Sequence, residues 1–249
     1  MNKIQLLDEL KSYSFPELII KAFEKVKREN FVPENLREFA YLNQPLPTAK
    51  GSTISQPYTI AFMLNLLELE RLTDKKLITY INSKQESSSK QERSINQTLS
   101  KISKSQKFDI ANKIKILEIG SGSGYVLTLI NEILKSLKIK KIRDYELYGI
   151  EIIYELVKKS KAILKNEKKI KIIKSDGSKG LKEKAPFDRI LASAAFSKIP
   201  EHLFSQLKVN GILVTPVNNS IFQFKKKKNK IEKKEFPGFV FVPVLEGNI

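Results

Sequence analysis

Residues 116–125 read Ile-Leu-Glu-Ile-Gly-Ser-Gly-Ser-Gly-Tyr, an apolar run followed by three glycines that alternate with serines. The apolar residues from 114 to 119 predict a short buried strand, and the apolar spacing from Tyr125 to Leu137 predicts a helix. A glycine-rich turn between a strand and a helix is typical of nucleotide-binding sites. Glycine lets the backbone approach a ligand, and a helix N-terminus offers unpaired N–H donors. The segment therefore predicts an α/β fold with a ligand site at the end of a strand.

The spacing of the glycines distinguishes two kinds of ligand. A dinucleotide-binding loop has the pattern Gly-x-Gly-x-x-Gly, which would require glycine at position 125, where this chain has Tyr125. Glycines at 120, 122 and 124 after Glu118 are instead similar to the loop of S-adenosylmethionine (SAM) methyltransferases. Glu118 would repel a pyrophosphate, whereas its charge suits the ammonium and sulfonium groups of SAM. For the loop alone, a glycine-rich turn in another α/β fold stays an alternative.

Two more acids follow at predicted strand ends. The chain after the loop predicts a helix at 153–164 and strands at 145–151, 170–174 and 187–193. The carboxyl ends of strands in a doubly wound sheet face the ligand crevice. We therefore expect Glu151 to accept from ribose hydroxyls and Asp176 to accept from the adenine amino group, with Gly177 leaving room for the base. For each acid taken singly, a solvated strand-end carboxylate is the alternative.

Motifs on both sides of this segment point to one family. They are Arg28-Glu29-Asn30-Phe31-Val32-Pro33, Thr53-Ile54-Ser55-Gln56-Pro57-Tyr58, Ala185-Pro186-Phe187-Asp188-Arg189-Ile190 and Phe241-Val242-Pro243-Val244. In this order the chain resembles the protein-L-isoaspartate (D-aspartate) O-methyltransferases over most of its length. The resemblance implies a doubly wound, mostly parallel Rossmann-like α/β sheet with helices on both faces. It also implies an N-terminal helical extension and a C-terminal antiparallel hairpin.

The resemblance implies methyl transfer from SAM to the α-carboxylate of L-isoaspartyl and D-aspartyl residues in damaged proteins, which initiates repair. A carboxylate with a pKa of about 4 is ionised at neutral pH, so the reaction needs orientation more than a general base. By resemblance, Ser55 contacts the reacting carboxylate. A helix-capping role for Ser55 is the alternative, and the two roles are compatible.

The remaining site residues are also implied by the resemblance. Residues expected to hold the substrate are Thr53, Ile54, Ala194 and Ala195. Residues expected to bind SAM are Glu118, Gly120, Ser121, Gly122, Ser123, Gly124, Glu151, Ile152, Asp176 and Gly177.

Two other functions stay open. The first is a SAM-dependent nucleic-acid methyltransferase, which the net charge of +18 favours. It lacks an Asn/Asp-Pro-Pro-Tyr motif, and it leaves residues 53–57 unexplained. The second is a methyltransferase-like binding protein without activity, against which intact Ser55 and the three strand-end acids argue.

Composition sets further bounds. A chain of 249 residues with 41% hydrophobic content can bury a full α/β core. The absence of cysteine and the single histidine, His202, argue against disulfides, metal sites and Ser-His-Asp catalysis. We expect a cytoplasmic monomer that binds no metal, no membrane and no nucleic acid. The lysines of 225–234 are expected to form a solvated hairpin tip between strands at 221–224 and 239–244, with a polyanion site as the alternative.

Three segments are expected to pack as one domain. Residues 1–70 form an N-terminal segment with helices at 4–10, at 16–28 and from Pro57, and this segment contacts substrate. Residues 71–113 form an insert rich in Ser, Gln and Lys, a composition typical of mobile chain. Residues 114–249 form the SAM-binding core.

Overall fold

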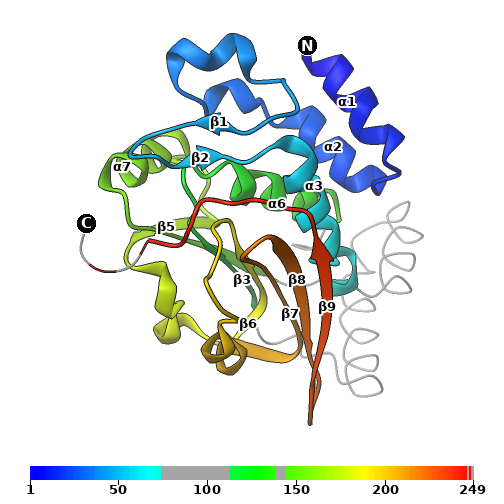
Figure 1. Cartoon of the computed structure of the whole chain (residues 1–249), viewed down its shortest axis with the longest axis vertical. Coiled ribbons are helices and arrows are strands. Elements are labelled where there is room, and N and C mark those ends of the chain that lie inside the picture. The colour runs from blue at the N-terminus through cyan, green and yellow to red at the C-terminus, as the bar shows by residue number, and fades with distance from the viewer. Residues whose placement is uncertain (74–112, 138–143, 246, 248–249) are drawn as a thin grey trace, which may run out of the picture.

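A computed structural model describes residues 1–73, 113–137, 144–245 and 247. Most of the predicted insert, residues 74–112, therefore lies outside the described residues. A sheet of seven strands organises the chain in the order β5-β4-β3-β6-β7-β8-β9 (Figure 1). Its strands are β3 (Ile114–Ile119), β4 (Tyr145–Glu151), β5 (Ile170–Lys174), β6 (Phe187–Ala192), β7 (Leu207–Val217), β8 (Ser220–Lys226) and β9 (Ile231–Pro237).

The first five strands of the sheet are parallel, and β3 lies at their centre between β4 and β6. Both faces of a parallel sheet are covered, so its strands are buried along almost their whole length, as β3 and β6 are. From β3 the chain proceeds to β4 and β5 on one side and then returns to β6 on the other. Strand order thus reverses beside β3, and ligands of such sheets bind at the carboxyl ends next to this point.

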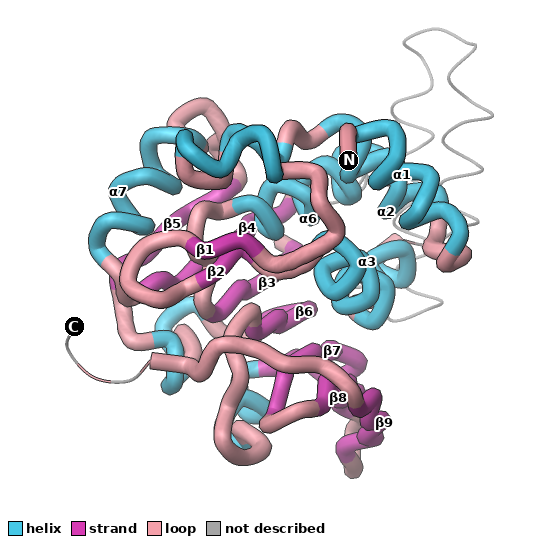
Figure 2. The backbone as a smooth tube through the Cα atoms, turned by 45° about the horizontal axis from the view of Figure 1, so that its top comes forward, coloured by secondary structure: helices cyan, strands magenta, loops and turns pink. Residues whose placement is uncertain are grey.

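Different helices pack on the two faces of the sheet. One face packs against α6 (Tyr125–Ser136), α7 (Tyr154–Ile163) and the N-terminal helices α1 (Lys3–Ser12), α2 (Glu17–Lys25) and α3 (Pro57–Leu66) (Figure 2). The other face packs against short 3-10 helices within residues 177–206. The predicted mostly parallel sheet with helices on both faces is confirmed, and so is the N-terminal helical extension. None of the described helices is long and apolar enough to cross a membrane.

The C-terminal hairpin is present, but the prediction placed its second strand wrongly. β8 pairs with β9, from Lys226 opposite Ile231 to Ser220 opposite Pro237. Two lysines of the expected tip, Lys233 and Lys234, therefore belong to an edge strand, where charged side chains are tolerated because one side of the strand faces solvent. Residues 239–244 instead cross the carboxyl ends of the parallel strands (Figure 1), with Pro243 bridging to Ala195.

The end of α3 is anchored to the sheet by two buried side chains. The Arg189 guanidinium donates from Nε to the Leu67 carbonyl at 2.5 Å and from Nη2 to the Glu68 carbonyl at 3.1 Å. Gln223 of β8 donates from Nε2 to the Leu66 carbonyl at 2.6 Å. The last carbonyls of a helix have no partner within the helix, so the sheet supplies the donors that α3 lacks. Burial lowers the pKa of Arg189 to about 10, which leaves it charged at neutral pH.

Replacing Arg189 with Met should lower the free energy of unfolding by about 3 kcal/mol, because two carbonyls at the helix end lose their donors. Urea denaturation followed by circular dichroism measures the change. Arg71→Met is the control, since the Arg71 side chain is 67% exposed and forms a surface ion pair with Glu68. That control should shift stability by less than about 1 kcal/mol. Equal losses in the two variants would contradict the anchor.

Candidate active site

The glycine loop after β3 has a backbone that its three glycines make possible. Gly120, Gly122 and Gly124 all have positive φ values, of +74°, +51° and +84°, a region that other residues enter at a cost. A Cβ on Gly124 would also lie 2.6 Å from Leu164 Cδ1. The N–H groups of Gly120 and Ser121 both donate to the Ile150 carbonyl at 2.9 Å. The loop is thereby fixed against the end of β4.

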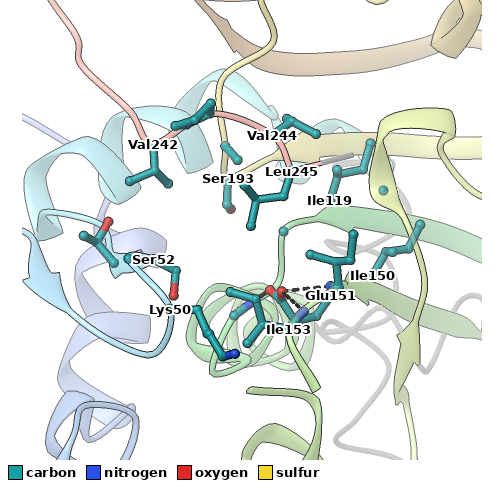
Figure 3. Close-up of a pocket in the computed structure, with 18 residues that line it drawn as sticks. Lys50, Ser52, Ile119, Ile150, Glu151, Ile153, Ser193, Val242, Val244 and Leu245 are labelled. Carbon is teal, nitrogen blue, oxygen red and sulfur yellow. Dashed lines mark hydrogen bonds between the residues drawn. The ribbon is translucent and has the colours of Figure 1, made fainter. Parts of the chain in front are cut away.

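Glu151 closes the same loop from the neighbouring strand end. Its Oε2 accepts from the Gly122 N–H at 2.8 Å, and its Oε1 accepts from the N–H groups of Ile152 and Ile153 at 2.8 and 2.9 Å (Figure 3). The side chain is buried. Because each carboxylate oxygen can accept more than one hydrogen bond, Glu151 still has acceptor capacity for a ligand hydroxyl.

A cavity of about 210 Å³ opens at this loop. The glycine loop and the ends of β3 and β4 form one side, while residues 50–53 and 242–245 form the other (Figure 3). Seven predicted site residues line it: Thr53, Gly120, Gly122, Glu151, Ile152, Gly177 and Ala194. The other predicted residues lie outside its lining: Ile54, Ser55, Glu118, Ser121, Ser123, Gly124, Asp176 and Ala195.

The sequence analysis missed two segments of this cavity. Lys50, Gly51 and Ser52 come from a turn closed by a hydrogen bond of 2.8 Å from the Thr48 N–H to the Ser52 carbonyl. Residues 242–244 belong to a motif noted in the sequence, but they were predicted to lie in a hairpin strand, and no prediction covered Leu245. Both segments reach the cavity from distant parts of the chain, which local spacing does not reveal.

Glu118 lies on the α6 side of β3 and is 1% exposed. Its Oε1 accepts from the Ser193 hydroxyl at 2.6 Å, and its Oε2 has no hydrogen-bond partner among the described residues. Burial raises the pKa of Glu118 to about 8, against the opposing effect of the Ser193 hydrogen bond. The negative charge expected from the sequence is therefore suppressed near neutral pH, until a cation or donor compensates for burial.

Glu118 should make stability depend on pH. Its pKa rises from an ordinary 4.5 to about 8 on folding, so between these values the folded state holds a proton that the unfolded state has released. Stability then falls as pH rises, by up to about 1.4 kcal/mol per pH unit. Glu118→Gln should flatten this slope, as measured by urea denaturation at pH 5, 6, 7 and 8. Identical slopes in the two proteins would show that Glu118 titrates normally.

Asp176 follows β5 (Ile170–Lys174) and precedes Gly177, which lines the cavity. Its Oδ1 accepts from the Ser178 N–H at 2.8 Å, and its Oδ2 accepts from the Gly247 N–H at 3.1 Å. Burial alone would raise the pKa of Asp176, but these hydrogen bonds outweigh it and lower the pKa. Asp176 is therefore ionised at neutral pH. At Gly177, a Cβ would lie 2.7 Å from Ile119 Cγ2, so a side chain here would press into the wall of the cavity.

Ser55 lines a second cavity of about 280 Å³. This cavity shares Thr53, Ser193 and Val242 with the first. The capping alternative for Ser55 is wrong, because Gln56 is the N-cap residue of α3, and the side chain that accepts from the first-turn Tyr58 N–H belongs to Asn43. Ser55 therefore lines the cavity and does not cap α3.

The backbone groups expected to hold a substrate are already engaged. Ala195 donates its N–H to the Val242 carbonyl and accepts from the Val244 N–H, both at 2.8 Å. The Ile54 carbonyl accepts from Arg28 Nη2 at 3.5 Å. Thr53 and Ile54 form the short strand β2, which pairs with β1 (Leu46–Pro47). In this conformation Ala195 holds the C-terminal segment in place over the cavity.

The mostly parallel sheet, the glycine loop and the strand-end carboxylates define a protein of the Rossmann-like methyltransferase class. The sequence model of the protein-L-isoaspartate(D-aspartate) O-methyltransferase family matches residues 1–77 and 73–248. The chain therefore belongs to this family.

Individual relatives agree with the family match. The protein-L-isoaspartate O-methyltransferase of Petrotoga mobilis is 35% identical over 237 residues, covering 92% of this chain and 87% of the relative. The enzyme of the same name from Fervidobacterium nodosum is 33% identical, covering 96% and 99%. A solved structure of a putative protein-L-isoaspartate O-methyltransferase from Plasmodium falciparum, in complex with S-adenosyl-L-homocysteine, superposes with a TM-score of 0.68 at 22% identity. It covers 99% of this chain and 100% of that one, and it shares the fold.

Proposed function

We propose that the protein transfers a methyl group from SAM to the α-carboxylate of L-isoaspartyl and D-aspartyl residues in damaged proteins, which initiates their repair. The observation that carries this proposal is the pair of cavities that share Thr53, Ser193 and Val242. One cavity borders the glycine loop and the other borders Ser55. A methyl donor bound in the first cavity and a substrate carboxylate bound in the second would lie close together where the two cavities share these residues.

The residues around the first cavity fit SAM. Glu151 offers acceptor capacity beside the loop, and Glu118 Oε2 and Ser121 Oγ are buried polar atoms without partners among the described residues. Gly177 carries no side chain at a point of the cavity lining where a Cβ would lie only 2.7 Å from Ile119 Cγ2. Lys50 supplies an ammonium group at the cavity for a ligand carboxylate. When bound, SAM supplies an electrophilic methyl group on a positively charged sulfur.

Asp176→Asn should weaken SAM binding while keeping the fold. Asparagine retains an oxygen that accepts from the Ser178 N–H. Its NH2 group, however, would replace the carboxylate oxygen that accepts from the adenine amino group, and an NH2 group cannot accept that hydrogen bond. The loss of one charged hydrogen bond should raise Kd by roughly 10- to 100-fold, as measured by isothermal titration calorimetry.

The control for this prediction is Glu155→Gln, which removes an exposed acid from the first turn of α7. This variant should bind SAM as the wild type does. An unchanged Kd in Asp176→Asn would remove Asp176 from the adenine site.

In the second cavity, Ser55 orients the substrate. The hydroxyl donates to one oxygen of the ionised α-carboxylate and leaves the other aimed at the first cavity. The partly buried apolar side chains of Phe241 and Val242 in the same lining limit water. No general base is required, because the nucleophile is already an anion.

Ser55→Ala should reduce the turnover number for an isoaspartyl peptide by about tenfold or more, with the SAM affinity unchanged. Transfer of radioactive methyl groups from SAM measures turnover, and Ser55→Thr, which keeps the hydroxyl, should retain most of the activity. The same peptide with ordinary aspartate should not be methylated. Wild-type protein that methylates bulk RNA and leaves isoaspartyl peptide unmodified would overturn the proposed function.

The lysine-rich hairpin does not favour the nucleic-acid alternative. Lys225 pairs with Glu68, and Lys226 donates to the carbonyls of Phe204 and Leu207. Lys227 and Lys230 both pair with Glu232. Many of the charges are thus compensated or used within the fold. We also propose that the protein is a cytoplasmic monomer that binds damaged proteins and no nucleic acid.

A further inference from the structure

We propose that an aromatic groove beside the Ser55 cavity binds an aromatic side chain of the substrate, about two residues from the isoaspartyl residue. This inference rests on the proposed function and deepens it, because it names a preferred class of peptide. The groove has a volume of about 620 Å³. We call it the aromatic groove after the rings that line it: Tyr13, Tyr58, Phe62, Phe236 and Phe239.

The rings of the aromatic groove form an ordered wall. Phe239 is nearly parallel to Tyr58, at 5° with centroids 6.5 Å apart, and it is stacked on Phe62 at 5.1 Å. Tyr13 meets Tyr58 edge-on at 4.6 Å. A further ring can add to such a wall in an offset or edge-to-face arrangement, which contributes beyond simple apolar burial.

The aromatic groove adjoins the Ser55 cavity at Gln56, which lines both. Gln56 is held by a hydrogen bond of 2.9 Å from its Nε2 to the Asn43 carbonyl, and its Oε1 accepts from Thr59 at 3.2 Å. Asn43 Oδ1 in turn accepts from the Tyr58 N–H at 2.9 Å. The border between the two hollows is therefore fixed before any peptide binds.

The geometry of an extended peptide sets the spacing. Alternate side chains of an extended chain point to the same side, about 7 Å apart. A substrate with its isoaspartyl carboxylate at Ser55 would place a side chain about two residues away beyond Gln56, in the aromatic groove. A side chain bound in the aromatic groove would thus belong to the same peptide as the isoaspartyl residue at Ser55.

Exposure and charge identify the kind of side chain. Tyr13 is 48% exposed, so an apolar ring stands open to solvent next to a reaction site on a chain of net charge +18. The charged residue in the groove lining, Glu235, accepts a hydrogen bond from Ser220 at 2.8 Å. Five of the nine lining residues are aromatic, so most of the contact offered to a side chain comes from rings, which suits an aromatic partner.

The test uses three short isoaspartyl peptides with Gly, Ala and Ser flanks. One has no aromatic residue, one has Phe two residues before the isoaspartyl residue, and one has Phe two residues after it. Binding of labelled peptides is measured by fluorescence anisotropy, and methylation gives KM and kcat. One Phe peptide should bind at least about fivefold more tightly than the peptide without Phe, with KM lowered in parallel and kcat unchanged.

Tyr13→Ser and Phe239→Leu should each reduce this preference to less than twofold. Tyr13→Phe, which keeps the ring, should retain the preference. The matched control is Phe39→Ser, which removes a ring that is 40% exposed and lines none of the three cavities. Equal affinity of wild type for all three peptides, or an equal loss in Phe39→Ser, would overturn the aromatic groove. A preference that depends on Tyr13, found without methylation of any peptide, would support the aromatic groove and reject the proposed function.

Discussion

The site depends on the buried carboxylate of Glu151. Three backbone N–H groups converge on it, from the glycine loop and from the start of the segment that enters α7. Hydrogen bonds to a charged acceptor are stronger than those between neutral groups. Because the three donors belong to two different connections of the sheet, one side chain sets the distance between them. The width of the ligand cavity at this edge is thereby fixed by an interaction inside the protein.

A second buried carboxylate behaves differently, although it lies one strand away. Glu118 has one hydroxyl partner and one oxygen without a partner, so burial dominates and raises its pKa to about 8. Glu151 accepts hydrogen bonds from three backbone N–H groups. The site thus combines a carboxylate that holds the backbone and keeps acceptor capacity for a hydroxyl with a second carboxylate that gains from a cationic neighbour. This pairing suits a ligand that carries both hydroxyl groups and positive charge.

Strands with continuous apolar runs were predictable from the sequence, and β5 begins and ends at the predicted residues. β9 was not predictable in this way, because its residues, Ile-Glu-Lys-Lys-Glu-Phe-Pro, are mostly charged and give no apolar alternation. The capping interpretation of Ser55 missed the helix start by one residue. At the cavity, Glu151 and Gly177 were found because parallel topology brings strand ends together. Lys50 and Leu245 were missed because their positions depend on tertiary contacts between loops.

The crossing of residues 239–245 over the strand ends affects the order in which the site can form. These residues follow every strand of the sheet in the chain, yet they provide the last wall of both cavities. The sheet can therefore assemble before the cavities exist. A ligand that contacts this wall binds the completed form in preference to the open one, and by mass action it stabilises the closed segment. Ligand binding and the final step of folding are thus thermodynamically linked in this protein.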